Sequence, residues 1–433
     1  MDLQHRIFDY ESSEQLLHDR QIAGLQLPFA RETGILKTPL RLGQRQIENR
    51  LAAQPVEGFD ALPDGSPSEK NMARYRAYAA GMSGMIWLES VSVCASGRSN
   101  PSQLWLRREN VDRFRCLADE IRTAANSWGR PYTVVQLTHS GRYSGQHSAA
   151  GPESAFHNPL IPKEHERILT DGELSSLEDD YLLAAQLAQE AGFDAVDVRA
   201  CHGYLINELL AAREREGRYG GGFENRARFL LDVVEKIRAH TEIEVAVRLN
   251  VYDALAYPYG FGVSQKGAAI PDLEEPVRLA KLLFERGVRL FNITCGIGAC
   301  SPQVIRPSDT GGEIYRTEHP LTGVDRMLRL TRQIKQAVPQ AAVVASAFTW
   351  LREFGANVAA GGIEQGWFDF AGFGRQPVCY PDYARDILTG GGMKRERCCT
   401  TCNGCMAWIK KTGKAIRCVK AETGGRTKER DAK

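Results

Sequence analysis

The chain has 433 residues, of which 43% are hydrophobic and 25% charged, and its formal net charge is +2. These values are ordinary for a globular protein, and a charge so near zero argues against nucleic acid as a partner across the whole surface. No apolar run is long enough for a membrane span, and the charged N-terminus lacks the pattern of a secretory signal. Eleven cysteines, gathered toward one end, favour the reducing cytoplasm over a disulfide framework.

Two segments lie outside the repeating pattern of the chain. Residues 1–35 are expected to form an N-terminal extension that caps the main fold, and residues 152–174 an excursion from it. Elsewhere one unit recurs, a short apolar strand followed by an amphipathic helix. Near-continuous apolar runs indicate strands that are buried on both faces of a parallel sheet. In chain order the expected strands are residues 51–54, 85–89, 133–137, 195–199, 245–249, 290–294, 342–346 and 368–372.

The segments between the strands carry apolar side chains at helical spacing. Residues 228–240 and 276–286 each place their apolar side chains on one face. Pro276 at the start of the second helix and Gly287 just after its end are typical helix boundaries. Eight strand–helix units close into a barrel more readily than they extend an open sheet. We therefore predict an α/β fold, a (β/α)8 TIM barrel, over residues 36–392.

A TIM barrel holds its active site where the strands end. Polar side chains occupy that position after strands three, four and five: Gln136, Arg199 followed by His202, and Arg248. After strand eight, glycine backbone and the Arg375 guanidinium are suited to bind phosphate. Three of these residues have a structural alternative, Gln136 as a bonded core amide, Arg248 as an ion-pair partner and His202 as a packing residue. A sugar-phosphate aldolase or isomerase would need a lysine or paired carboxylates at the strand ends, and no lysine lies there.

Four cysteines near the C-terminal end have the spacing of metal ligands. Cys399, Cys402, Cys405 and Cys418 form a C-x2-C-x2-C-x12-C run. Soft thiolates at this spacing suit either an iron–sulfur cluster or tetrahedral zinc. An iron–sulfur cluster would make this an electron-transfer protein. Zinc would instead have a structural role, in a barrel that binds protein or nucleic acid through its basic C-terminal end. We assign residues 393–433 to this metal-binding segment and its tail.

From about residue 36 to residue 418 the chain resembles a known family. The motifs that carry the resemblance are Asn-Arg at 49–50, Gln-Leu-Thr-His-Ser-Gly-Arg-Tyr at 136–143, His-Gly-Tyr-Leu-Ile-Asn-Glu at 202–208, Arg-Tyr-Gly-Gly-Gly-Phe-Glu-Asn-Arg-Ala-Arg-Phe at 218–229 and Gly-Arg-Gln-Pro at 374–377. They resemble the Old Yellow Enzyme-like NADH:flavin oxidoreductases, in particular the iron–sulfur branch that includes 2,4-dienoyl-CoA reductase and trimethylamine dehydrogenase. The cysteine spacing is similar to that of the amine dehydrogenases, which implies a 4Fe-4S cluster.

The resemblance implies an FMN cofactor across the mouth of the barrel. Gln54, Pro55 and Val56 would line it, and Gln136 would bond the pyrimidine edge. Arg248 would lie near the part of the ring where negative charge collects on reduction, and a fixed cation there favours the reduced form. The phosphate would be held at Ala347, Phe348, Gly374 and Arg375.

The resemblance also implies a substrate site, where this chain departs from the family pattern. Old Yellow Enzymes bind a carbonyl oxygen with two residues three apart, His and His or His and Asn, and here that pair is Arg199 and His202. Because the arginine fork matches a carboxylate, we expect a small anionic or strongly polar substrate, with a salt bridge to Asp197 as the alternative. Tyr204 occupies the position of the family's proton donor. Cys300 stands where dienoyl-CoA reductase has a histidine, which weakens any transfer of that mechanism.

Two reactions fit these residues. One is reduction of an activated C=C bond, which the tyrosine favours; the other is amine oxidation or N-demethylation, which the cysteine spacing favours. The relatives continue into further nucleotide-binding domains that this sequence does not include. We therefore expect electrons to be exchanged with a separate electron-transfer protein, or with external NADH or NADPH, and a homo-oligomer stays open. A basic stretch could steer an acidic partner: Lys410, Lys411, Lys414 and Arg417.

Overall fold

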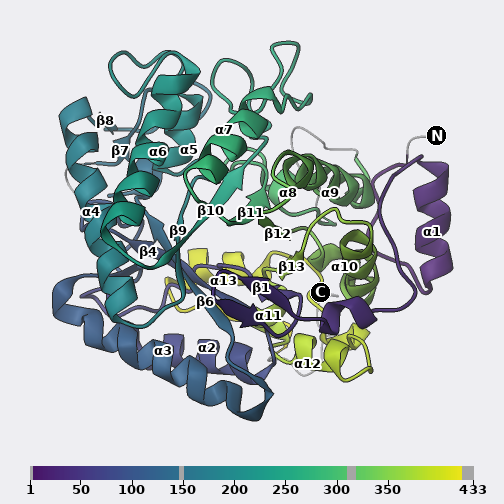
Figure 1. The fold of residues 1–433 in the computed structure, drawn as a ribbon. Coiled ribbons are helices and arrows are strands. Elements are labelled where there is room, and N and C mark those ends of the chain that lie inside the picture. Colours follow the sequence, from purple (N-terminus) through teal and green to yellow (C-terminus); the bar gives the residue numbers. More distant parts are fainter. Residues whose placement is uncertain (1–2, 146–150, 310–317, 422–433) are drawn as a thin grey trace, which may run out of the picture.

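The computed structural model describes residues 3–145, 151–309 and 318–421, and within them eight parallel strands form a closed barrel (Figure 1). Around the barrel the order is β3, β13, β12, β11, β10, β9, β6 and β4, and β3 pairs with β4 to close the ring. The predicted (β/α)8 TIM barrel is therefore confirmed. The strands are β3 (Leu51–Ala53), β4 (Met85–Ser92), β6 (Tyr132–Thr138), β9 (Ala195–Val198), β10 (Glu244–Asn250), β11 (Leu290–Thr294), β12 (Ala342–Ala345) and β13 (Phe370–Phe373).

The last strand differs from its predicted bounds for a physical reason. It was expected at residues 368–372, but its ladder with β12 begins at Phe370, opposite Val344. The ring of Phe368 packs instead against Phe348, with centroids 5.7 Å apart. Side-chain packing, and not strand pairing, therefore fixes Phe368.

Helices surround the barrel and bury one face against it (Figure 1). α7 begins two residues before the expected Pro276, because Glu274 and Glu275 occupy its first turn, where their charge complements the unpaired amides. Pro276 is tolerated there, since an N–H in the first turn has no helical partner. The longer helices are α2 (Glu69–Ala80), α3 (Val111–Ala125), α4 (Asp171–Glu190), α6 (Phe223–His240), α7 (Glu274–Glu285), α9 (Pro320–Ala337) and α10 (Gly355–Glu364). Shorter ones are α1 (Ser13–Ile22), α5 (Leu205–Ala211), α8 (Pro302–Ile305), α11 (Gln376–Cys379), α12 (Tyr383–Leu388) and α13 (Gly404–Thr412).

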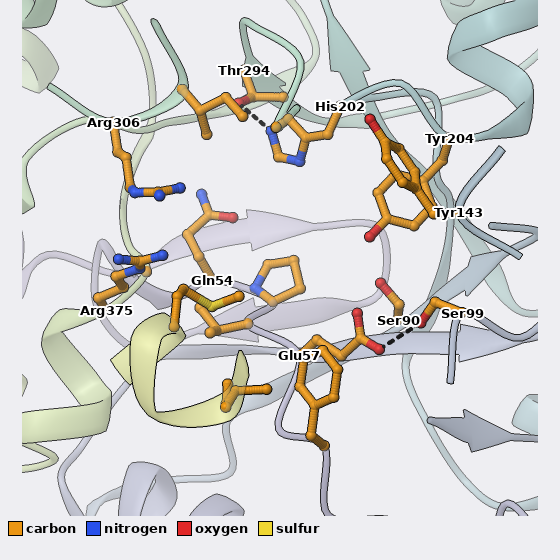
Figure 2. A pocket seen from close by; sticks show the side chains of 18 of the residues that line it. Gln54, Glu57, Ser90, Ser99, Tyr143, His202, Tyr204, Thr294, Arg306 and Arg375 are labelled. Carbon is orange, nitrogen blue, oxygen red and sulfur yellow. Dashed lines mark hydrogen bonds between the residues drawn. The ribbon is translucent and has the colours of Figure 1, made fainter. Parts of the chain in front are cut away.

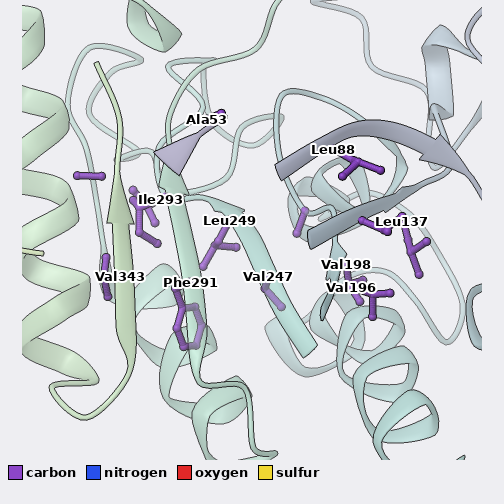
Figure 3. Packing of buried hydrophobic residues seen from close by; sticks show 14 of the residues in the cluster. Ala53, Leu88, Leu137, Val196, Val198, Val247, Leu249, Phe291, Ile293 and Val343 are labelled. Carbon is purple, nitrogen blue, oxygen red and sulfur yellow. The ribbon is translucent and has the colours of Figure 1, made fainter. Parts of the chain in front are cut away.

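Side chains alternate along each barrel strand between two hydrophobic clusters. Val247 and Leu249 of β10 face the helices, as do Leu88, Val196 and Phe291 of other strands (Figure 3). A second cluster fills the interior of the barrel at the end where the strands begin, and Ile47 of the β1–β2 hairpin (Leu40–Leu42 and Arg45–Ile47) belongs to it. Its members on the barrel strands are Ala52, Met85, Trp87, Tyr132, Val134, Ala195, Ala246, Leu290, Ala342, Val344 and Phe370. Because apolar side chains close this end, polar chemistry is left to the carboxyl ends of the strands.

The N-terminal segment packs on the outside of the barrel wall. The rings of Phe8 and Tyr10 lie 5.2 Å and 6.1 Å from that of Trp350. The expected excursion after the third barrel strand contains a two-residue pairing of β7 (Glu153–Ser154) with β8 (Arg167–Ile168), and it ends earlier than predicted because Thr170 caps α4. Across the described ranges we found no helix with the length and apolarity needed to span a bilayer.

Candidate active site

A cavity of about 890 Å³ opens where the barrel strands end (Figure 2). Its size falls within the range of cofactor and substrate pockets. Most of the predicted site residues line it: Gln54, Pro55, Val56, Arg199, His202, Tyr204, Arg248, Ala347, Gly374 and Arg375. The topology thus brings together residues that are far apart in the sequence, because parallel strands carry their ends to one edge.

Gln136 and Phe348 were predicted in the site but do not line the cavity. Gln136 is 1% exposed; its amide donates to Asp197 at 2.7 Å, and its oxygen accepts from the Ser90 hydroxyl at 3.2 Å. Gln136 is therefore a buried amide with its hydrogen bonds satisfied, and Ser90, to which it is bonded, lines the cavity in its stead. Phe348 is fully buried against the ring of Phe373, 5.5 Å away.

Gln54 forms a rigid part of the cavity floor. Its Nε2 donates to Asn292 Oδ1 and to Ser346 Oγ, both at 3.1 Å, and its Oε1 accepts from Asn292 Nδ2 at 2.7 Å. A Cβ added at Gly372 would lie 1.9 Å from Gln54 Nε2. The neighbouring strand must therefore carry glycine at that position for the glutamine to keep its bonds.

Two buried arginines face the cavity without a carboxylate partner. Arg199 and Arg248 are each 7% exposed, and in the described ranges neither forms an ion pair and both leave Nε without a hydrogen bond. The alternative salt bridge of Arg199 with Asp197 is not formed, since that carboxylate accepts from Trp87 and from the Arg248 backbone N–H. Burial lowers the pKa of Arg248 from its usual value. Both guanidiniums can therefore bind an anion or a polar ring edge.

His202 and Tyr204 differ in how they hold protons. His202 has a left-handed φ of 63°, and its Nε2 lies 2.9 Å from Thr294 Oγ1. Burial and the nearby Arg248 hold its pKa well below the usual range, so the ring is neutral. Burial raises the pKa of Tyr204, although Arg199, whose guanidinium lies 3.4 Å from the ring centroid, lowers it. At neutral pH the phenol thus keeps its proton.

Several lining residues were not predicted from the sequence. Glu57 follows the predicted Val56 on the loop after β3, and Tyr143 closes a recognised motif, yet neither had been given a role. Among the described residues the Tyr143 hydroxyl has no hydrogen-bond partner, and the Tyr143 ring lies 5.3 Å from that of Tyr204. The hydroxyl of Ser90 accepts from Arg199. Its position just after a predicted strand end was the one feature of the sequence that could have indicated Glu57 as a site residue.

A pair of arginines marks the other side of the cavity. Arg306 and Arg375 both donate to Asn403 Oδ1, at 3.1 Å and 2.7 Å, and their guanidiniums face the cavity beside Gln54 (Figure 2). Burial and the charge of Arg375 lower the pKa of Arg306 to about 10. Two like charges held together in this way favour an anion such as phosphate. Lys410, one of the basic residues that could steer an acidic partner, is exposed and also lines the cavity.

The predicted metal ligands lie on the segment that carries Asn403. Cys399, Cys405 and Cys418 are partly buried, and Cys402 is exposed. Cys379, which was not predicted, lies beside them: its thiol donates to the backbone oxygens of Gln376 and Arg397, and it lowers the pKa of Cys399 to about 7 and that of Cys418 to about 6. In the part of the chain that the structure describes, no group of three or more His, Cys, Asp or Glu side chains is arranged to hold a metal ion. The thiol chemistry fits a cluster, but the described thiols do not form one coordination shell.

Comparison with known proteins agrees with this architecture. The sequence profile of the NADH:flavin oxidoreductase / NADH oxidase family matches residues 36–267, more than half of the chain. The chain is 27% identical over 395 residues to an NADH oxidase from Thermoanaerobacter brockii, which covers 89% of this chain and 56% of the relative. It is 29% identical over 279 residues to an NADPH dehydrogenase from Geobacillus sp. (strain WCH70), covering 63% of this chain and 75% of that one. The chain therefore spans little more than half the length of the NADH oxidase.

Solved structures share the fold. A 2-naphthoyl-CoA reductase in complex with 2-naphthoyl-CoA has a TM-score of 0.72 at 22% identity, covering 89% of this chain and 56% of that chain. Histamine dehydrogenase from Rhizobium sp. 4-9 has a TM-score of 0.69 at 20% identity, covering 90% and 52%. An old yellow enzyme homologue from Zymomonas mobilis has a TM-score of 0.64 at 24% identity, covering 85% and 98%.

Fold and cavity together define an enzyme of the (β/α)8-barrel class, with its chemistry at the carboxyl ends of the strands. The profile match identifies the family. The chain belongs to the NADH:flavin oxidoreductase / NADH oxidase family of flavin-dependent oxidoreductases, as the sequence motifs had indicated.

Proposed function

We propose that this protein is an FMN- and 4Fe-4S-dependent oxidoreductase that exchanges hydride between flavin and a small anionic substrate, and that it reduces an activated C=C bond. The observation that carries the proposal is the juxtaposition of Arg199 and Tyr204 in the cavity wall. One residue supplies a fixed positive charge, and the other supplies a phenol that keeps its proton at neutral pH.

The residues of the cavity fit FMN. The Nε atom of Arg248 has no hydrogen-bond partner in the part of the chain that the structure describes, and the amide of Gln54 is fixed by its bonds in the cavity floor. The arginine pair of Arg306 and Arg375 would hold the phosphate, near the backbone of Ala347 and Gly374. When bound, FMN supplies reversible hydride transfer. A buried cation beside the flavin favours its reduced, anionic form.

The polar side chains have separate roles in the proposed reduction. Arg199 binds the carboxylate of the substrate and orients it, helped by the Ser90 hydroxyl that holds one end of its fork. Tyr204 donates a proton to one alkene carbon while the other receives hydride. His202 is neutral and tied to Thr294, which makes it a hydrogen-bonding group and not the acid.

Amine oxidation with electron transfer to a cluster is the second candidate, and the four-cysteine segment favours it. Asn403 lies between two of these cysteines and bonds both phosphate-side arginines, which ties the segment to the cavity. Histamine dehydrogenase, which shares the fold, is named for oxidation of an amine. The direction of electron flow, the identity of the electron partner and the presence of a bound cluster stay predictions.

Anaerobic half-reactions separate the two candidates. NADH or NADPH is expected to bleach the flavin absorption of the purified protein, and an α,β-unsaturated carboxylate is expected to restore it. Tyr204→Phe should leave the reduction by nicotinamide unchanged and slow the reoxidation by alkene about 100- to 10,000-fold, because only the second step needs a proton donor. Unchanged alkene reoxidation in Tyr204→Phe would contradict the assigned role, and bleaching by an amine in place of the nicotinamide would favour amine oxidation.

A further inference from the structure

Glu57 gives the cavity a charge that the proposed function does not use. In the described chain it is the single carboxylate among the residues that line the cavity. The basic residues that line the same cavity are Arg199, Arg248, Arg306, Arg375 and Lys410. Despite these neighbours, Glu57 takes part in no ion pair that the described residues form.

The carboxylate of Glu57 is held in place from one side. Its Oε1 accepts from Ser99 Oγ at 2.8 Å and from Asn100 Nδ2 at 2.7 Å. The other oxygen points into the cavity, toward the side where Tyr143 and Tyr204 lie (Figure 2). A carboxylate that is fixed by two donors and leaves one oxygen free is preorganised for an incoming donor.

The surroundings of Glu57 contain both signs of charge. Burial raises its pKa, the bond from Ser99 lowers it, the nearby Glu89 raises it and Arg199 lowers it. Glu89 is itself paired with Arg74, so its charge is largely compensated. Glu57 and Arg199 both line the cavity, and no hydrogen bond or ion pair joins them among the described residues, so the same cavity presents a negative and a positive group.

We propose that Glu57 is a specificity-determining residue that selects a zwitterionic substrate, with Arg199 binding its carboxylate and Glu57 its ammonium group. A partly buried carboxylate without an ion-pair partner among the described residues is costly, and a cationic group on the substrate offsets this cost. The tilted rings of Tyr143 and Tyr204, 5.3 Å apart, add aromatic surface that favours an alkylated ammonium. This proposal rests on the proposed flavin site, because it names the substrate class of that same cavity.

A pair of isosteric probes isolates the positive charge. Glycine betaine and 3,3-dimethylbutyrate share a carboxylate and a trimethyl head, and differ in having nitrogen or carbon at its centre. Titration calorimetry of the flavin-loaded protein should show betaine binding about tenfold more tightly or better. Glu57→Gln should abolish this preference by weakening betaine alone. Glu216→Gln, which removes an exposed carboxylate that does not line the cavity, should retain it.

Three results would overturn the proposal. They are equal affinity of the wild-type protein for the two probes, absence of binding of either probe, and a preference that survives in Glu57→Gln. The absorption spectrum of the same samples reports bound flavin. Protein without flavin would refute the proposed function and this proposal with it, whereas flavin-loaded protein that treats both probes alike would refute this proposal alone.

Discussion

Replacing Arg199 by alanine is expected to lower kcat/KM for an α,β-unsaturated carboxylate about 100-fold or more, while FMN remains bound. Arg199 is 7% exposed, its guanidinium is held by Ser90 and by the ring of Tyr204, and its Nε has no hydrogen-bond partner among the described residues. Truncation removes a positioned, desolvated cation that no other residue at that wall replaces. The cofactor floor at Gln54 makes its bonds to Asn292 and Ser346 and does not depend on Arg199.

The controls for Arg199 separate binding of the anion from general damage. The methyl ester of the same substrate should lose much less activity, and Arg199→Lys should restore part of the rate for the acid, because it keeps charge but not the fork. Arg199 also lowers the pKa of Tyr204, so its removal should move the alkaline limb of the pH profile to higher pH. Loss of flavin, or an equal loss for acid and ester, would contradict the placement of this residue.

Glu208→Gln is expected to reduce the free energy of unfolding by about 3 kcal/mol or more, because it leaves the Arg142 guanidinium buried without its main partner. Both side chains are nearly inaccessible, and Arg142 also donates to the backbone oxygens of Ile161 and Phe156. Burial raises the pKa of Glu208 even beside Arg142, so forming the pair stabilises little. Breaking it is costly, since the remaining charge cannot reach water.

Urea unfolding measures this effect against a matched exposed pair. Glu224→Gln removes the partner of Arg278 on the surface, where both side chains are more than half exposed, and should cost less than about 1 kcal/mol. Glu166, 3.8 Å from Arg142, limits the loss in Glu208→Gln but is too distant for a direct hydrogen bond. Similar losses in the two variants would show that Glu208 does not brace the loop after β6.

The barrel could be predicted from the sequence because its signal is local and repeated. Each strand is a short run of apolar residues, because both of its faces are buried. Val247, for example, faces the helices, whereas its neighbour Ala246 faces the filled interior of the barrel. Strand ends then located Arg199, Arg248 and Arg375 correctly in one cavity. Periodicity could not reveal where side-chain packing replaces strand pairing, as it does at Phe368, just before the start of the last barrel strand.

The details of the site depend on side-chain contacts between distant segments, which one sequence does not encode visibly. Gln136 does not reach the cavity, because Ser90 of the neighbouring strand lines the cavity there and donates a hydrogen bond to the Gln136 side chain. Arg306 follows a short helix with no motif of its own, and it enters the site through Asn403, almost one hundred residues later. No motif distinguishes Glu57 in the sequence, and its place in the site depends on Ser99 and Asn100, which hold it at the cavity.

The most direct test of this account is the cofactor content of the protein purified without oxygen. The account predicts a yellow-brown protein that releases about one FMN per chain on denaturation, and that contains iron and labile sulfide, about four of each. A colourless protein that contains zinc and no flavin would contradict it, because the cavity would then hold no flavin and the four-cysteine segment no electron carrier.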